Sequence, residues 1–413
     1  MLAQRVQSLF KPILYKHKTV YLYIRNEQKF IKKYLIDSYN WKKHLLFRIN
    51  KKKFLEKILG RTFDYTKCSK YNPYYLKYGF KFPMYEFEYY AINSGVKSDL
   101  YLPDAFFHLY VLPYLNHSKW QSAYANKNMM ARLLDINEAK NHIDVLVPEC
   151  ITCCDNGRFF IFKQALESCM RHEAVEAVLS SEDDLIIKPT VQSAHGNGVR
   201  LLHNSDKTKD NIQNIFDQYG NNFVVQRKIV QHPELEKFNP SSVNTIRITT
   251  YQDLNGKVKI LYATQRFGGK GRICDNADPH ENPNESGGFC AIKPDGTLDR
   301  RVHRMRNTQT TYLAEDIGEK IPYFDKVQKA ACYLHSRFPH FALIAWDIAI
   351  SPEGHPIVLE YNFGMGLATC QLAHGPLFSK EDLDEIMERV SKGKIVRKST
   401  YPIFYPSKKN SGI

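Results

Sequence analysis

Residues 346–362 read WDIAISPEGHPIVLEYN and carry the strongest structural signal in this chain of 413 residues. Two β-runs rich in Ile, Val and Leu enclose a Ser-Pro-Glu-Gly turn, a pattern that predicts an antiparallel hairpin. Pairing of the two runs brings Asp347 close to Glu360. Glu360 and Asn362 lie two positions apart, so their side chains project from the same face of the sheet.

The polar side chains of this hairpin predict a divalent-metal site. Two carboxylates and a carboxamide form an all-oxygen ligand set, which suits Mg²⁺ bridging the phosphates of ATP better than it suits zinc. Burial of two carboxylates among apolar strands without a cation would carry a heavy desolvation cost. The alternative is that each carboxylate lies at a strand edge in water. We expect Asp347, Glu360 and Asn362 to hold Mg²⁺.

A second signal is the run LIIKP at residues 185–189, followed by TVQSAHGNGV. Lys188 closes a buried strand, where its ammonium group can contact a phosphate. The loop that follows contains Ser193, Gly196 and Gly198, which allow backbone N–H groups to approach the same ligand. The lysine precedes the glycines, so the order differs from that of a P-loop. Taken alone, a Gly-Asn-Gly turn is usually only a hairpin.

A third signal is FVVQRKI at residues 223–229, an apolar strand that leads into a polar connector. The backbone edge of such a connector can bind an adenine ring, and this prediction places Gln226, Lys228 and Ile229 beside the base. Glu234 would then accept hydrogen bonds from the ribose hydroxyls. The alternative is a plain core strand followed by a solvated acid.

Arginines on two successive strands provide the fourth signal. Arg247 and Arg266 lie on or at the end of predicted strands, where rigid guanidinium groups can hold phosphate and carboxylate together. With Lys188 they form the predicted catalytic set. The polar loop between residues 272 and 288 is bounded by glycines, which fits a mobile loop that recognises the acceptor, although an inert excursion fits as well. The other predicted substrate contacts are Asn244, Arg272, Asp275 and Asn276.

Strands and helices are mixed along the chain, which predicts an α+β fold with mainly antiparallel pairing. Helices are expected at residues 127–139 and 164–178. Strands are expected at residues 142–147, 158–163, 184–188, 223–226, 245–251, 258–264, 342–350 and 356–361. The predicted segments are a basic helical N-terminal lobe (1–60), an aromatic-rich cap (61–120), two α+β subdomains (121–228 and 229–385) and a basic tail (386–413).

The net charge of +15 is concentrated at the start of the chain, where residues 1–60 hold 15 Lys and Arg against 3 acids. Apolar residues recur there with roughly helical spacing, so one face is apolar and the remainder cationic. This pattern fits a docked helical lobe with a solvated lysine face, or a helix on an anionic membrane surface. No nucleic-acid-binding motif accompanies the charge, so nucleic acid is not an expected partner.

The sequence shows no signal peptide and no apolar run near the ~18 residues that span a bilayer. We therefore expect a cytoplasmic protein, at most peripheral to the inner face of the membrane. The nine cysteines are expected to be reduced. Cys150, Cys153 and Cys154 form a C-x-x-C-C cluster, but no partner stands at zinc spacing, so inert thiols are expected rather than metal or redox chemistry.

The sequence resembles the ATP-grasp superfamily, and more narrowly its sugar-transfer-associated members, over about residues 98–377. The phrases that carry the likeness are IIKPTVQSAHGNGV, FVVQRKIVQHPEL, SSVNTIRITTY and the paired runs WDIAI and IVLEYN. The resemblance implies an ATP-grasp fold, in which two α+β subdomains clamp ATP. It also implies three sets of ligands: Asp347, Glu360 and Asn362 for Mg²⁺, Lys127 and Lys188 for the ATP phosphates, and Gln226 to Ile229 with Glu234 for adenine and ribose.

Two positions depart from the pattern of the superfamily. Its hinges often carry a glutamate, whereas Gln226 and Arg227 stand here, which puts a side-chain contact with adenine in question. The dipeptide-forming branch places an arginine two residues before the metal-binding aspartate, where this chain has Ala345. Arg247 and Arg266 are therefore the candidates for binding the substrate carboxylate.

The resemblance implies an ADP-forming carboxylate–amine ligase that works through an acyl-phosphate. Its partners would be a carboxylate-bearing sugar or glycan, such as a uronic acid, and an amine or amino acid, in the biosynthesis of a surface polysaccharide. Two alternatives remain open. One is a small-molecule kinase with the same ATP site, and the other is a non-catalytic, membrane-associated scaffold for glycan assembly.

Overall fold

The computed structural model describes residues 55–57, 59–60, 71–117, 120–121, 124–162, 166–190, 198–275, 287–304, 311–313, 320–397 and 402–406. The chain forms two compact units, Met1–Tyr114 with Ser379–Ile413, and Leu115–Phe378. The basic lobe predicted at residues 1–60 lies almost entirely outside the described residues, and the division into five segments stays a prediction. Within the described part of the chain, no helix combines the length and the apolar character needed to cross a bilayer.

The first unit contains short helices, one longer helix and a hairpin of two strands. Its elements are α4 (Pro73–Leu76), α5 (Tyr85–Ser94), α6 (Asp104–Phe106), η2 (Phe107–Val111), α7 (Leu112–Leu115), α16 (Lys380–Lys392), β14 (Gly393–Arg397) and β15 (Pro402–Pro406). Aromatic rings fill its core, with Tyr75 and Phe106 each packed edge-on against Phe82 at 5.1 Å between ring centroids. Asp384 of α16 accepts hydrogen bonds from the hydroxyls of Tyr74 and Tyr78, which ties α16 to α4.

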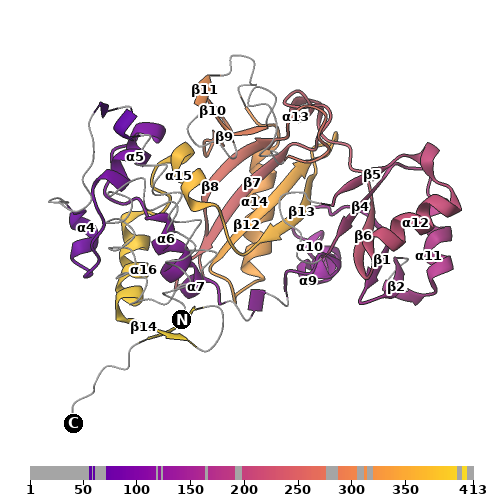
Figure 1. The fold of residues 1–413 in the computed structure, drawn as a ribbon, viewed down its shortest axis with the longest axis horizontal. Coiled ribbons are helices and arrows are strands. Elements are labelled where there is room, and N and C mark those ends of the chain that lie inside the picture. The colour runs from indigo at the N-terminus through magenta and orange to yellow at the C-terminus, as the bar shows by residue number, and fades with distance from the viewer. Residues whose placement is uncertain are drawn as a thin grey trace, which may run out of the picture. The chain divides into compact units, whose positions relative to one another are not determined.

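The second unit contains two antiparallel sheets, and the first of these has six strands in the order β3-β2-β1-β6-β4-β5. The strands are β1 (Cys150–Asp155), β2 (Arg158–Phe162), β3 (Leu166–Cys169), β4 (Leu185–Pro189), β5 (Arg200–Leu202) and β6 (Asn222–Arg227). Figure 1 shows α11 (Arg171–Leu179) and α12 (Lys209–Tyr219) side by side on one side of this sheet. Val175 and Phe216 of these helices share a core with Phe223 of β6.

The second sheet has seven strands in the order β11-β10-β9-β8-β7-β12-β13. The strands are β7 (Thr245–Gln252), β8 (Val258–Phe267), β9 (Gly288–Ile292), β10 (Leu298–Arg304), β11 (Thr311–Leu313), β12 (Leu343–Ile350) and β13 (Pro356–Asn362). The short elements around the sheets are η3 (Lys127–Met129), α9 (Met130–Leu134), α10 (Ile136–Ala139), η4 (Asn204–Asp206) and α13 (Pro233–Glu236).

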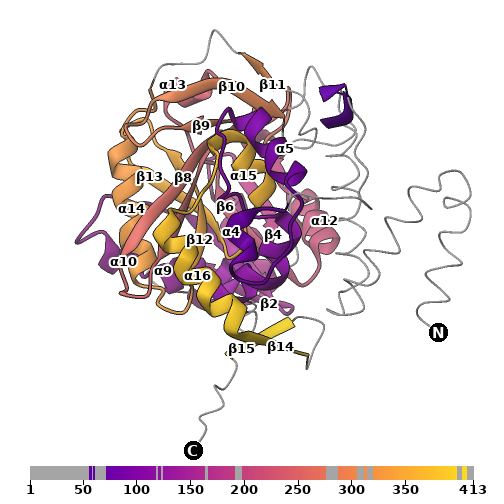
Figure 2. The same ribbon diagram turned by 90° about the vertical axis from the view of Figure 1, so that its left-hand side faces the viewer.

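Two helices cover opposite faces of the seven-stranded sheet, α14 (Phe324–Ser336) and α15 (Leu367–His374) (Figures 1 and 2). Leu334 of α14 packs in one core with Ile248 and Trp346. Successive residues of a strand face opposite sides. The neighbours of Ile248 and Trp346 therefore face away from this core, and His374 of α15 bonds to Thr264 on that other face at 3.0 Å.

The other face of the sheet carries one polar residue on each of four neighbouring strands. Thr264 of β8 lies opposite Arg247 of β7, Arg247 lies opposite Asp347 of β12, and Asp347 lies opposite Glu360 of β13. The register of the sheet thus forms a row of four side chains that the sequence separates by as many as 113 positions between Arg247 and Glu360. The strand pairing fixes the order of these four side chains.

The structure confirms the α+β prediction, and seven of the eight predicted strands correspond to β2, β4, β6, β7, β8, β12 and β13. Asn156 and Gly157 both have positive φ, +49° and +79°, and form the turn between the paired strands β1 and β2. The hairpin of residues 346–362 is formed by β12 and β13.

Three local predictions are wrong. Residues 142–147 do not form a strand, because His142 and Ile143 bond back to Ala139, and only Leu146 makes an isolated bridge. The helix predicted at 164–178 starts only at Arg171, where Glu173 accepts a hydrogen bond from the backbone N–H at the helix start, and the preceding residues form β3. The helix predicted at 127–139 breaks into η3, α9 and α10, with a positive φ of +46° at Asp135.

Candidate functional site

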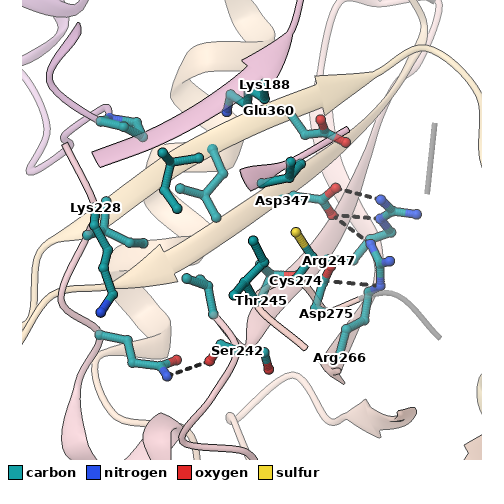
Figure 3. A pocket seen from close by; sticks show the side chains of 18 of the residues that line it. Lys188, Lys228, Ser242, Thr245, Arg247, Arg266, Cys274, Asp275, Asp347 and Glu360 are labelled. Carbon is teal, nitrogen blue, oxygen red and sulfur yellow. Dashed lines mark hydrogen bonds and ion pairs between the residues drawn. The ribbon is translucent and has the colours of Figure 1, made fainter. Parts of the chain in front are cut away.

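A cavity of about 840 Å³ lies between the two sheets of the second unit and gathers most of the predicted site residues (Figure 3). The predicted residues in its wall are Lys127, Lys188, Gln226, Lys228, Ile229, Arg247, Arg266, Asp275, Asp347, Glu360 and Asn362. One end is formed by β4, β6 and the connector that follows β6. The other end is formed by the polar face of the seven-stranded sheet.

Asp347 lies at the centre of a cluster of charges on that polar face. Arg247 binds its carboxylate through two groups, Nε to Oδ1 at 2.7 Å and Nη2 to Oδ2 at 2.5 Å. Arg266 donates from Nη1 to Oδ1 at 3.3 Å. Burial alone would raise the pKa of Asp347, but the charges of Arg247 and Arg266 outweigh burial and hold this pKa below its usual range. Asp347 is therefore ionised at neutral pH.

Asp275 extends the cluster beyond Arg266. It accepts a hydrogen bond from the hydroxyl of Thr245, and Arg266 Nε lies 3.5 Å from its Oδ2 (Figure 3). Burial raises the pKa of Asp275, and the charge of Arg266 opposes that shift. The close approach of Gly268 to Cys274 helps place this segment, because a Cβ at Gly268 would collide with the Cys274 carbonyl oxygen. Both arginines thus have acidic partners in the wall itself.

The three predicted metal ligands lie together. The Asn362 amide nitrogen is 3.5 Å from Asp347 Oδ2 and 3.2 Å from Glu360 Oε1, so this donor stands between the two carboxylates. Lys127 lies on the outer side of Glu360, with 3.7 Å between Nζ and Oε2. Among the described residues, no group of three or more His, Cys, Asp and Glu side chains forms a metal centre by itself. The two carboxylates beside Asn362 are those of Asp347 and Glu360.

Lys188 faces the acidic pair from the opposite sheet. It lies at the end of β4, and Figure 3 shows it close to Glu360. Burial lowers the pKa of its ammonium group, and the charge of Glu360 opposes that shift. Within the described part of the chain, no hydrogen bond or ion pair to Lys188 is formed. A buried ammonium group without a partner favours an anionic ligand at this position.

Apolar side chains line the end of the cavity at the six-stranded sheet, called here the apolar slot. Its side chains come from β4, β5 and β13 and from the segments around them: Pro148, Ile186, Val199, Leu201, Ile229 and Leu359. The connector after β6 forms its edge, and there the backbone N–H of Ile229 has no backbone partner among the described residues. An apolar slot with a free N–H at its rim suits a flat heterocyclic ring.

Several predicted residues lie elsewhere. The carboxylate of Glu234 pairs with Lys237 at 2.6 Å and does not line the cavity, whereas Glu236 does. Arg272 and Gly198 are not in the wall either, and the side chain of Asn244 is fully buried, where it donates to the carbonyls of Leu235 and Asn239. The remaining predicted residues, Ser193, Gly196 and Asn276, lie outside the described residues.

The sequence analysis missed several wall residues near the arginines: Ser242, Thr264, Cys274, Phe289, Thr369 and Cys370. Thr264 lies on a predicted strand, but the run VKILYATQR around it shows no alternation that would mark it. Ser242 and Cys274 lie outside helices and strands, Phe289 lies on the short strand β9, and Thr369 and Cys370 lie in α15. Burial raises the pKa of the Cys274 thiol to about 11 and that of Cys153 to about 12, so both thiols are protonated at neutral pH.

A cavity of this composition suits a ligand with a flat apolar group at one end and several negative charges at the other. The chain belongs to the sugar-transfer associated ATP-grasp family, whose profile matches residues 112–387. This match confirms the family and the ATP-grasp fold predicted from the sequence. It makes ATP with Mg²⁺ the expected cofactor pair, as also predicted. No curated protein matches the sequence at a significant level.

Solved structures with a similar fold include several ligases. The ATP-grasp ligase PsnB complexed with a minimal precursor is 14% identical, with a TM-score of 0.38 over 66% of this chain and 64% of that chain. The VanG D-Ala:D-Ser ligase from Enterococcus faecalis is 12% identical, with a TM-score of 0.39 over 66% and 63%. The D-alanine–D-alanine ligase from Bacillus anthracis is 14% identical, with a TM-score of 0.36 over 65% and 69%. The chain spans less than two thirds of PsnB and of the VanG ligase.

Proposed function

We propose that this protein is an ATP- and Mg²⁺-dependent ligase that joins a carboxylate to an amine and forms ADP. The observation that supports the proposal is the arrangement of charged side chains in one cavity. The row Arg247, Asp347 and Glu360 on one sheet faces the partnerless ammonium group of Lys188 on the other. Cations and acids from two sheets meet at the mouth of an apolar slot, which is where the triphosphate of a nucleotide held in that slot would lie.

The residues present fit Mg²⁺. An ionised carboxylate offers about four lone-pair sites, and the Asn362 amide nitrogen already stands between Asp347 and Glu360, where a shared cation would bind. Turning this amide presents its oxygen instead of its nitrogen, which completes a set of oxygen ligands. When bound there, Mg²⁺ would neutralise charge on the phosphates. Asp347, Glu360 and Asn362 are the residues proposed to hold it.

The nucleotide site uses the other wall. Lys188 and Lys127 are proposed to bind the phosphates, because both ammonium groups lie beside Glu360. The apolar slot is proposed to hold the adenine ring, with the Ile229 N–H as a hydrogen-bond donor. Glu236, which lines the cavity, is the acid now proposed for the ribose hydroxyls in place of Glu234.

The chain's own cations account for the chemistry. A carboxylate is a poor electrophile because its charge repels nucleophiles. Transfer of the γ-phosphoryl group to it forms an acyl-phosphate, and an amine then attacks the acyl carbon and displaces phosphate. Negative charge spreads over the transferring group, and fixed cations stabilise it without reorganisation. Lys188 and Arg247 are proposed for this role, and Arg247 keeps Nη1 free of partners among the described residues.

We propose a sugar-linked carboxylate, such as a uronic acid, as the first substrate and an amino acid or other amine as the second. The support is the description of the family as sugar-transfer associated. To test it, the protein is incubated with ATP, Mg²⁺, a uronate-containing glycan and mixed amino acids. ADP, phosphate and an amide product should appear together. Release of ADP that is independent of the uronate would overturn the choice of substrate.

One observation favours a second candidate, a kinase that phosphorylates a hydroxyl group. Arg247 and Arg266 are bound by Asp347 and Asp275, so little unpaired positive charge remains at the acceptor end for a substrate carboxylate. The fate of the phosphate separates the two candidates. A ligase releases free phosphate with an amide product, whereas a kinase leaves the phosphate on the acceptor.

A further inference from the structure

Thr264 and His374 form a hydrogen-bonded pair at the end of the cavity away from the apolar slot. Thr264 is 5% exposed and lines the cavity. His374 is the last residue of α15 and lies behind Thr264, with 3.0 Å between Thr264 Oγ1 and His374 Nε2. The proposed sites for ATP and Mg²⁺ use neither side chain, so the pair is available to the second substrate.

The register of the sheet places this pair next to the centre of the proposed reaction. Along the polar face, the metal-binding pair Asp347 and Glu360 is followed by Arg247 and then, on the next strand, by Thr264. Neighbouring strands lie about 4.8 Å apart. A phosphoryl group beside the metal-binding pair and an acyl carbon beside Arg247 would therefore leave the Thr264 side to the attacking amine.

An amine must lose a proton before it attacks, because at neutral pH it is mostly an ammonium ion without a lone pair on nitrogen. The described acids that line the cavity are Glu236, Asp275, Asp347 and Glu360. The last three form ion pairs with arginine or lysine side chains, and Glu236 is the acid proposed for the ribose hydroxyls. The Thr264 hydroxyl differs from all four, because its partner His374 is an imidazole, which can take up a proton.

The pair can accept a proton from the amine if the hydroxyl donates to the imidazole. An ammonium group only donates, whereas a hydroxyl has one proton and two lone pairs. When Thr264 donates to His374 Nε2, its lone pairs stay available to the amine. Burial and the charge of His303 lower the pKa of His374 to about 4, against the opposing charge of Asp299. The imidazole is therefore neutral at pH 7, and one of its ring nitrogens is free to accept.

The second ring nitrogen of His374 provides a way out for the proton. His374 is half-buried. Its Nδ1 makes no hydrogen bond within the described residues and is not enclosed by the protein. Because burial disfavours a lasting charge on this imidazole, a proton taken up at Nε2 is matched by the release of another from Nδ1 to water.

We infer that Thr264 and His374 form a proton relay for the attacking amine. The amine gives one proton to Thr264 Oγ1 while the Thr264 hydroxyl proton moves to His374 Nε2, and Nδ1 releases a proton to water. The nitrogen lone pair then forms the C–N bond, the bond from the acyl carbon to the phosphate oxygen breaks, and the leaving phosphate takes the second proton. Exchange with water restores the starting tautomer. The inference rests on the proposed function, because it places an acyl-phosphate beside Arg247.

The test separates the two half-reactions by the choice of nucleophile. Hydroxylamine is unprotonated at neutral pH and traps an acyl-phosphate as a hydroxamate, whereas an amino acid must first lose a proton. Each is supplied with ATP, Mg²⁺ and a uronate-containing glycan to the unmodified protein, Thr264→Val, Thr264→Ser and His374→Gln. The matched control is Thr152→Val, since Thr152 is a buried threonine outside the cavity whose hydroxyl donates to Phe160 O at 2.7 Å. Thermal melting of each variant reports whether the fold is intact.

With mixed amino acids, amide formation should fall at least about a hundredfold in Thr264→Val and His374→Gln, while hydroxamate formation stays within about twofold. Thr264→Ser, which keeps the hydroxyl, and Thr152→Val should form amide at close to the original rate. An equal fall of both products in Thr264→Val would overturn the inference. Undiminished amide formation by His374→Gln would also overturn it, because glutamine can bond to Thr264 but cannot take up its proton.

A measurement without substrates tests the direction of the hydrogen bond. In ¹⁵N spectra of the histidine-labelled protein at pH 7, with His374 assigned by comparison with His374→Gln, the relay requires a proton on Nδ1 and none on Nε2. A proton on Nε2 would overturn the inference. Absence of both hydroxamate and amide from the unmodified protein, with Nε2 unprotonated, would instead overturn the proposed function.

Discussion

Replacement of Arg247 by Met should destabilise the second unit by about 3 kcal/mol. The carboxylate of Asp347 is 7% exposed and receives two hydrogen bonds from Arg247, at 2.7 and 2.5 Å. Removing one partner of a buried ion pair costs roughly 3–5 kcal/mol, because the other charge stays buried without compensation. Arg266 remains 3.3 Å from Asp347, and the Arg247 side chain is 23% exposed, so the low end of that range applies.

The assay is urea unfolding at pH 7, followed by fluorescence, for Arg247→Met, Asp347→Asn and the double variant. The double variant should be more stable than the sum of the two single losses predicts, by about 1–3 kcal/mol, since it leaves no unpaired carboxylate. The control is Arg171→Met. Arg171 pairs with Asp217 at 2.6 Å in the open, at 44% and 63% side-chain exposure, and its loss should cost less than about 1 kcal/mol. Equal effects of Arg247→Met and Arg171→Met would refute the reasoning.

Three further predictions concern the same cavity. Glu360→Gln should change stability by less than about 1 kcal/mol, because this carboxylate is 36% exposed, yet it should reduce Mg²⁺-dependent ATP turnover at least about a hundredfold; an active variant would exclude Glu360 as a metal ligand. Lys188→Met should leave the melting temperature unchanged or raise it, because burial disfavours the charged ammonium group. The affinity for ATP, measured by calorimetry, should fall at least about tenfold. A loss of stability would show that the lysine has a structural partner. The pKa of Asp347 in the folded protein lies below its usual value. The contribution of this carboxylate to stability is therefore present above about pH 4 and is lost as pH falls through the folded pKa. Urea titrations between pH 2 and 6 should show this loss, and Asp347→Asn should remove that part of the pH dependence.

The proximity of Asp347 and Glu360 could be predicted from the sequence because it is local. Asp347 and Glu360 lie on adjacent strands joined by five residues, 351–355, so their pairing is local. A β-bulge between Asp347 and Ile348 shifts the register by one residue and brings Asp347 opposite Glu360. The contact between Arg247 and Asp347 joins positions 100 residues apart. It depends on which strand pairs with β12 and in which register, and neither follows from the pattern of β7 alone. The sequence therefore predicted Arg247 as a site residue and left its partner open.

Local geometry also explains why Glu236 lines the cavity and Glu234 does not. Glu234 and Glu236 are both in α13, a helix of four residues. Residues two apart on a helix point to different sides, because each residue turns the chain by about 100°. A strand would have placed both acids on the same face. The single helical turn after Pro233 is too short to leave a periodic signal, so the sequence did not indicate Glu236.

The charge balance of the cavity connects stability with the proposed reaction. Arg247 and Arg266 form ion pairs with Asp347 and Asp275, so the buried charges on the polar face of the sheet are compensated within the protein itself. Lys188 on the opposite wall has no such partner among the described residues. A polyanion would therefore gain more from Lys188 than from the paired arginines. Binding of a divalent cation by Asp347 would withdraw negative charge from Arg247 and leave this guanidinium free to attract the transferring group. On this argument, metal and nucleotide should bind cooperatively, and loss of Asp347 should weaken that cooperativity more than it weakens the binding of the nucleotide alone.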